Sequence, residues 1–177
     1  MNAILKLGSL DDSKAFQRLL LVPFDHLNLK RGVLKDADPA TDIVLFVQSE
    51  RMVTGRPFHK ERLFFLISSA RHFALELEKS GFTVLFIEAE TTTAGITQAR
   101  KAVGELPVLC AEPSSFRQRS QLANFGVEFV ENDFFLTPRK LFQEWAGGQK
   151  SFVMENFYRA QRVRLDLLVT DGKPEQG

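Results

Sequence analysis

The sequence contains a single cysteine, a single tyrosine and no long hydrophobic run. One cysteine excludes an intramolecular disulfide and any metal site built from several cysteines. No apolar stretch approaches the roughly 20 residues that a membrane-spanning helix requires. Residues 1–9 lack the basic start and the apolar stretch of a signal peptide. We therefore expect a cytoplasmic domain with no membrane partner.

A strong charge of either sign is also missing. The formal net charge is +1, so the chain has no overall electrostatic attraction to nucleic acid. Hydrophobic residues make up 44% and charged residues 25% of the 177 positions. These values are ordinary for a soluble globular domain, and the length is sufficient for one full hydrophobic core.

The common catalytic and phosphate-binding motifs GxGxxG, GxxxxGK[ST] and GxSxG are absent. Asp25 and His26 follow the first predicted strand, either as an acid–base pair of a hydrolase or as a loop pair that binds nearby backbone groups. Cys110 lies inside a predicted strand and is interpreted as a core residue. Residues 116–119, with two arginines at a helix start, are either a phosphate site or a solvated helix face.

Residues 57–89 carry the clearest structural pattern. Leu66, Ala70 and Leu77 belong to one apolar face that repeats with helical spacing. Gly81 follows this face and is suited to a left-handed helix cap. The run 83–87 is apolar without alternation, as in a strand that is covered on both faces. A helix followed by such a strand is half of a βαβ unit.

The rest of the chain alternates in the same way. The predicted strands are 19–22, 43–47, 83–87, 107–111 and 127–130. The predicted helices are 59–80, 92–103, a helix capped by Ser114 or Ser115 that runs to 124, 138–145 and 151–168, followed by a polar tail over 169–177. Thr137 is the expected cap of the helix that starts at Pro138. This alternation predicts a doubly wound, five-stranded, mostly parallel α/β sheet of the Rossmann-like class. In such sheets ligands bind beyond the carboxyl ends of the strands, which directs attention to the loops 23–28, 48–58, 88–93 and 112–115.

Three ordered blocks of the sequence resemble the photolyase-related family. The run from His59 to Val84 is similar to the family pattern H-K-x-K-x-x-x-x-x-S-A-M-R-H-F-A-x-x-L-x-x-x-G-x-x-V. Glu112-Pro113 with Arg117 and Arg119 resembles E-P-x-x-x-R-x-R. The stretch from Met154 to Pro174 resembles M-E-Y-F-Y-R-x-M-R-R-x-x-x-L-L-M-x-x-x-x-P. The resemblance covers about residues 18–174.

This resemblance implies more than the composition does. It implies the N-terminal domain of an iron–sulfur (6-4) photolyase or cryptochrome, with strand order 3-2-1-4-5. Such a domain carries an antenna chromophore, 6,7-dimethyl-8-ribityllumazine. FAD, the iron–sulfur cluster and damaged DNA are bound by a longer downstream domain, which would be the partner of this one. We expect this chain to lack that domain and to be inactive alone.

The resemblance also names the residues around the antenna site. They are Asp25, His26, Gln48, Met52, Gly55 and Leu66. His26 stands where the family often has Gln, and Gln48 where a Glu is common. Met52 and Gly55 stand where an acid and a Tyr serve the antenna in relatives. Because these departures remove hydrogen-bonding groups from a buried site, we expect the antenna pocket to be empty or weakly occupied.

The domain organisation predicted from these observations has three parts. Residues 1–17 form a leader whose structure the pattern does not fix, with a short helix as one interpretation. Residues 18–149 form the α/β antenna-type domain, and residues 150–177 form a terminal helix and tail that lead toward the flavin domain. The function implied is light-dependent DNA repair or blue-light sensing. The alternative is a stand-alone, non-catalytic α/β domain that binds a nucleotide-like ligand or a protein partner.

Overall fold

The computed structural model describes residues 4–7, 15–55, 57–170 and 173–174. The chain divides into two compact units, residues 1–134 and residues 135–177. The predicted α/β domain was drawn to residue 149, whereas the first unit ends at Phe134. In the described part of the chain, no helix combines the length and the apolar character needed to cross a membrane.

The first unit is built on a six-stranded sheet with the order β1-β4-β3-β2-β5-β6. Its strands are β1 (Ile4–Leu7), β2 (Arg18–Leu21), β3 (Asp42–Ser49), β4 (Thr83–Ala89), β5 (Val108–Ala111) and β6 (Val127–Val130). The last five pair in parallel, so among themselves they have the predicted order 3-2-1-4-5. The predicted fold class is therefore confirmed.

The leader, residues 1–17, contains a strand, although a short helix was one interpretation of its sequence. Ile4–Leu7 forms β1, which pairs antiparallel with β4 at the edge of the sheet. The helical interpretation is wrong for these four residues, because backbone hydrogen bonds to a distant strand determine their conformation. The rest of the predicted leader helix, other than 15 and 16, lies outside the described residues.

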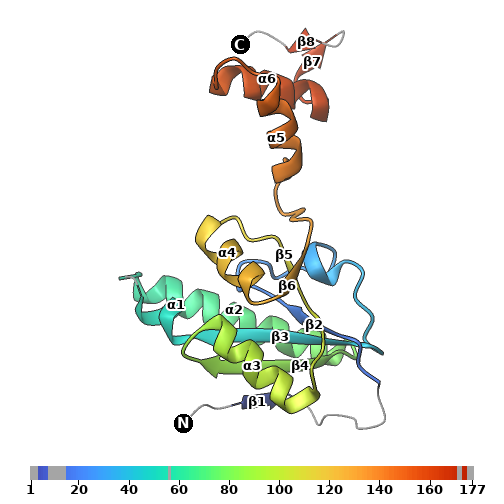
Figure 1. Ribbon diagram of the computed structural model, residues 1–177, viewed down its shortest axis with the longest axis vertical. Helices are drawn as coiled ribbons and strands as arrows, with labels where there is room; N and C mark the ends of the chain where they lie inside the picture. Colours follow the sequence, from blue (N-terminus) through green and yellow to red (C-terminus); the bar gives the residue numbers. More distant parts are fainter. Residues whose placement is uncertain (1–3, 8–14, 56, 171–172, 175–177) are drawn as a thin grey trace. The chain divides into compact units, whose positions relative to one another are not determined.

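Helices cover both faces of the sheet (Figure 1). They are η1 (Gly32–Leu34, a 3-10 turn), α1 (Glu50–Thr54), α2 (Lys60–Lys79), α3 (Thr92–Val103) and α4 (Phe116–Asn124). The buried face of α2 packs on one side through Ala70, Ala74 and Leu77. On the other side α3 and α4 pack through Ile96, Ala99 and Leu122.

Two glycines have clear structural roles. One ends α2, and the other lets α3 lie close to the sheet. Gly81 follows α2 with a φ of 92°, the left-handed conformation expected from its place in the sequence. Gly95 is buried in α3, and a Cβ atom there would lie only 2.5 Å from Cγ1 of Val47 in β3. The missing side chain at Gly95 is therefore what lets α3 lie so close to the sheet.

The second unit contains α5 (Arg139–Gly147), α6 (Met154–Leu165) and a short hairpin of β7 (Val169–Thr170) and β8 (Lys173–Pro174). Trp145 of α5 lies with its ring centroid 4.9 Å from that of Phe157 in α6. The final helix is shorter than the predicted 151–168, because Asp166 adopts a left-handed conformation that ends it. The predicted polar tail contains the β7–β8 hairpin.

The capping of α5 also differs from the expected arrangement. The sequence predicted that Thr137 would cap a helix starting at Pro138. Pro138 is itself the N-terminal cap, and no side chain bonds to the first turn there. The Thr137 hydroxyl instead donates a hydrogen bond of 2.7 Å to the side-chain oxygen of Gln161 in α6. Tertiary contact has replaced local capping at this position.

Candidate functional site

A cleft of about 380 Å³ lies at the carboxyl ends of the parallel strands. Its volume is within the range of small-molecule sites. The lining residues come from β2 and the loop after it, the end of β3, α1, β5, the segment before α2 and its first two turns, and the first turns of α3 and α4. They are Leu21, Val22, Pro23, Phe24, Asp25, Val47, Ser49, Met52, Phe58, Arg62, Leu66, Thr92, Cys110 and Gln118.

The topology explains why the cleft forms at this place. β2 has β3 on one side and β5 on the other, so the connections from these central strands leave in opposite directions. Two loops therefore separate at this point and leave a hollow between them, which is the switch-point site of doubly wound sheets. We name this hollow the strand-end cleft.

The structure brings three of the six predicted site residues into the strand-end cleft. Asp25 contributes a carboxylate from the loop after β2, Met52 contributes a thioether from α1, and Leu66 contributes an apolar wall from α2. Ser49, which caps α1 by accepting a hydrogen bond of 3.2 Å from the Met52 backbone, also lines it.

Gln48 and Gly55 do not line the cleft. The side-chain oxygen of Gln48 accepts a hydrogen bond of 3.2 Å from Arg71 of α2. The same guanidinium donates a bond of 2.9 Å to Glu88 of β4. Gly55 is exposed at the carboxyl end of α1, where its N–H donates to the Arg51 carbonyl. Gln48 thus belongs to a polar cluster on the α2 face of the sheet.

His26 is a packing residue in this structure. Its ring stacks on Phe134 with centroids 4.3 Å apart and an interplanar angle of 12°. Within the described part of the chain its buried Nδ1 has no hydrogen-bond partner. Burial lowers the pKa of His26, against the opposing influence of Asp25 and Asp133. No hydrogen bond joins Asp25 to His26 among the described residues, so this pair lacks the geometry of a catalytic dyad.

The remaining chemical candidates from the sequence have structural roles. Cys110 is fully buried in β5, and burial raises the pKa of its thiol to about 12. Such a thiol stays protonated and unreactive at neutral pH. Arg119 of the 116–119 stretch forms an ion pair of 3.0 Å with Glu112. Gln118 is the member of that stretch that lines the strand-end cleft.

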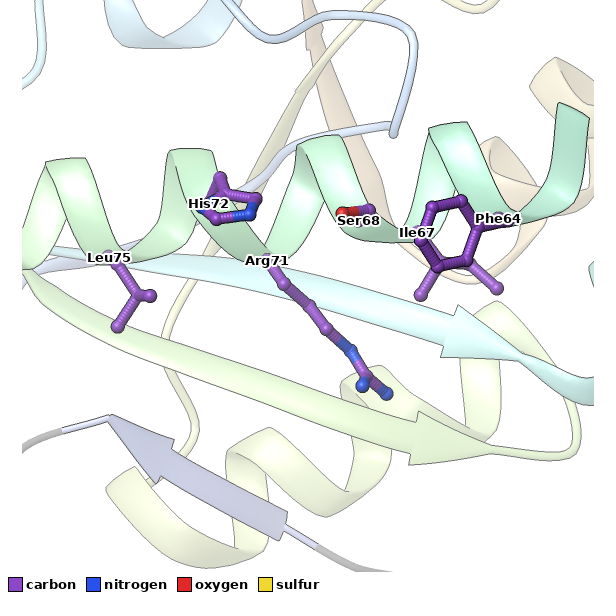
Figure 2. Close-up of a pocket in the computed structure, with 6 residues that line it drawn as sticks. All are labelled: Phe64, Ile67, Ser68, Arg71, His72 and Leu75. Carbon is purple, nitrogen blue, oxygen red and sulfur yellow. The ribbon is translucent and has the colours of Figure 1, made fainter. Parts of the chain in front are cut away.

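A second hollow of about 360 Å³ lies along α2, and Figure 2 shows its six lining residues. They are Phe64, Ile67, Ser68, Arg71, His72 and Leu75. Arg71 extends from the helix toward the strands, where it binds Glu88 and Gln48. Its charge is therefore already neutralised. The sequence did not indicate this groove.

Other lining residues of the strand-end cleft were also missed. Arg62 enters it from the first turn of α2, Phe58 from the segment before that helix, and Thr92 from the first turn of α3. A signal for Arg62 was present, since it lies four residues before Leu66 and therefore on the same side of the helix. Thr92 carried no comparable signal beyond its place in a loop that follows a strand.

The fold and the strand-end cleft together define a Rossmann-like α/β domain with a ligand-sized cleft at its switch point. Residues 20–177 match the family model described as deoxyribodipyrimidine photo-lyase-related protein. The chain belongs to this family. It is also 29% identical, over 174 residues, to a (6-4) photolyase of Agrobacterium fabrum (strain C58 / ATCC 33970). That match covers 90% of this chain and 34% of the relative, so the chain spans about a third of the relative's length.

Proposed function

We propose that this chain is the antenna-type α/β part of a photolyase-related protein that serves light-dependent DNA repair or blue-light sensing. In this role it holds a planar chromophore in the strand-end cleft. The observation that carries the proposal is the meeting of Asp25, Met52 and Leu66 in one cleft at the switch point of a family member. The cytoplasmic location expected from the sequence belongs to the same proposal.

The chemistry of the cleft fits a planar ring with a polyol chain, such as 6,7-dimethyl-8-ribityllumazine. Phe24, Phe58 and Leu66 supply apolar surface for a ring, while Asp25 supplies an acceptor for ring N–H or hydroxyl groups. Ser49 and Thr92 add hydroxyls. The bound chromophore would supply light absorption, and the role of these residues is to hold and orient it.

Met52 and Gly55 make that binding weak. The Met52 thioether in the cleft, and Gly55 outside it with no side chain to reach in, do not supply the hydrogen bonds that an acid and a tyrosine are expected to supply in relatives. The loss of roughly two hydrogen bonds, at about 0.5–1.5 kcal/mol each, weakens binding between about fivefold and more than a hundredfold. We therefore infer weak occupancy by the lumazine.

A titration of the purified chain with the ribityllumazine, followed by fluorescence anisotropy, tests the proposal. Leu66→Trp fills the cleft and is expected to abolish the weak binding. Leu75→Trp places the same side chain on α2 outside the cleft, and serves as the matched control that keeps binding. Equal binding by the Leu66→Trp variant would place the ligand elsewhere. Failure of every planar ligand to bind would favour the stand-alone domain with a protein partner.

FAD, the iron–sulfur cluster and DNA are assigned to the remainder of the full protein in this proposal. This chain has one cysteine, Cys110, and its side chain is fully buried. We expect the purified chain to carry no stoichiometric FAD and to show no repair of damaged DNA. A stoichiometric FAD band in the purified protein would contradict this assignment.

A further inference from the structure

Arg62 places a positive charge at the strand-end cleft. Its guanidinium carbon lies 5.3 Å from the centroid of the Phe58 ring, and both side chains line the cleft. No carboxylate pairs with Arg62 within the described ranges, whereas nearby Arg71 and Arg119 are held by Glu88 and Glu112. The cation–π contact positions the guanidinium without neutralising it.

Two helix starts add partial positive charge to the cleft from the face of the sheet opposite α2. Thr92 and Gln118, which line the cleft, belong to the first turns of α3 and α4. Backbone N–H groups at the start of a helix carry partial positive charge and favour anions. The starts of α3 and α4 therefore add to the positive potential in the cleft, to which Arg62 contributes the full positive charge.

Asp25 gives the cleft an acidic group as well. It comes from the loop after β2, whereas Arg62 comes from α2. A complementary ligand therefore combines hydrogen-bond donors for Asp25 with an anionic group for Arg62. A heteroaromatic ring with a polyol chain that ends in a phosphate has this character, while a neutral ribityl compound leaves Arg62 without a partner.

We propose that Arg62 makes the strand-end cleft selective for a planar heteroaromatic ligand that carries a terminal phosphate, over its neutral counterpart. This inference rests on the proposed function, because it assumes that the cleft holds such a ring. Arginine binds phosphate through charge-assisted, often bidentate hydrogen bonds. One such contact corresponds to a preference on the order of tenfold or more.

Flavin mononucleotide and riboflavin provide the test, because they differ only by the phosphate. Each is titrated with the purified chain and followed by flavin fluorescence anisotropy. We expect flavin mononucleotide to bind at least about tenfold more tightly, and Arg62→Gln to reduce this preference to about twofold or less. Arg51→Gln removes the same charge from an exposed side chain of α1 that does not line the cleft, and is expected to keep the preference.

Salt provides a second readout. Raising the salt concentration from about 20 to about 300 mM is expected to weaken binding of flavin mononucleotide and to leave riboflavin nearly unchanged, because only the phosphate contact is screened. The Arg62→Gln variant is expected to lose this salt dependence. Circular dichroism of each variant checks that the fold is intact.

The outcomes separate this inference from the function on which it rests. Equal affinities for the two flavins, with both blocked by Leu66→Trp, would overturn the selectivity and leave the cleft as the binding site. A preference that survives Arg62→Gln would overturn the role of Arg62. Absence of binding by both flavins and by the ribityllumazine would overturn the proposed function and this inference together.

Discussion

Arg18 and Asp42 form a two-pronged ion pair between paired residues of β2 and β3. Nε of Arg18 lies 2.8 Å from Oδ1 of Asp42, and one Nη lies 2.6 Å from Oδ2. The Asp42 side chain is fully buried, whereas that of Arg18 is 36% exposed. Asp42 also accepts a hydrogen bond of 2.9 Å from the Asp38 backbone. The guanidinium therefore neutralises a carboxylate that water does not reach.

Replacing Arg18 with alanine should destabilise the first unit strongly. The change leaves the Asp42 charge buried without its partner, which typically costs about 3–5 kcal/mol. We expect the free energy of unfolding, measured by urea denaturation and far-UV circular dichroism, to fall by about 3 kcal/mol. Glu105→Ala, which removes an exposed partner of Arg100, is the control and should change it by less than about 1 kcal/mol. Similar effects of the two substitutions would show that Asp42 is solvated.

Gly95→Ala tests the close approach of α3 to β3. Alanine favours helix formation by about 1 kcal/mol over glycine, but its Cβ would overlap Val47. Overpacking a core typically costs about 1–3 kcal/mol, so we expect net destabilisation. In a Val47→Ala background the same substitution should cost less, since the overlapping methyl groups are gone. A double-mutant cycle with no coupling would contradict the packing argument.

His26 should make the stability depend on pH. Burial lowers its pKa below the ordinary value of 6.5, so the unfolded chain takes up a proton before the folded one does. Stability from this group is therefore fully present above about pH 6.5 and is lost as the pH falls from there toward the folded pKa. Urea midpoints between about pH 5.5 and 7.5 measure this loss.

His26→Phe is the matched variant for this effect. It keeps an aromatic ring stacked on Phe134 and removes the buried Nδ1 that has no partner. We expect a smaller decline in stability toward pH 5.5 and a midpoint at pH 7.5 that is unchanged or higher. An identical pH dependence in both proteins would show that His26 is not its source.

The two units should unfold separately. Trp145, the one tryptophan of the sequence, lies in α5, so its fluorescence reports on the second unit. None of the described residues of α5 and α6 is buried, whereas the sheet of the first unit has an extensive buried core. We expect Trp145 emission to change at a lower urea concentration than the circular dichroism of the sheet. Coincident transitions would show one cooperative unit.

The strands and the fold class could be predicted from local patterns. The apolar runs 43–47 and 83–87 appear as β3 and β4, and Gly81 closes α2 as its position indicated. Strands in which apolar residues do not alternate with polar ones must be covered on both faces of the sheet. Short connections through helices then leave few possible topologies. β1 was not predicted, because its conformation depends on backbone pairing with β4, which is distant in the sequence.

The sequence by itself determined that a ligand site would be sought beyond the strand ends, since parallel strands bring their carboxyl ends to one edge. Only the tertiary structure decided which side chains enter it. Val47 and Ser49 line the cleft, while Gln48 between them points to the opposite face and binds Arg71, because side chains alternate along a strand. Arg62 and Thr92 reach the same cleft because α2 and α3 both begin at this edge of the sheet, on opposite faces.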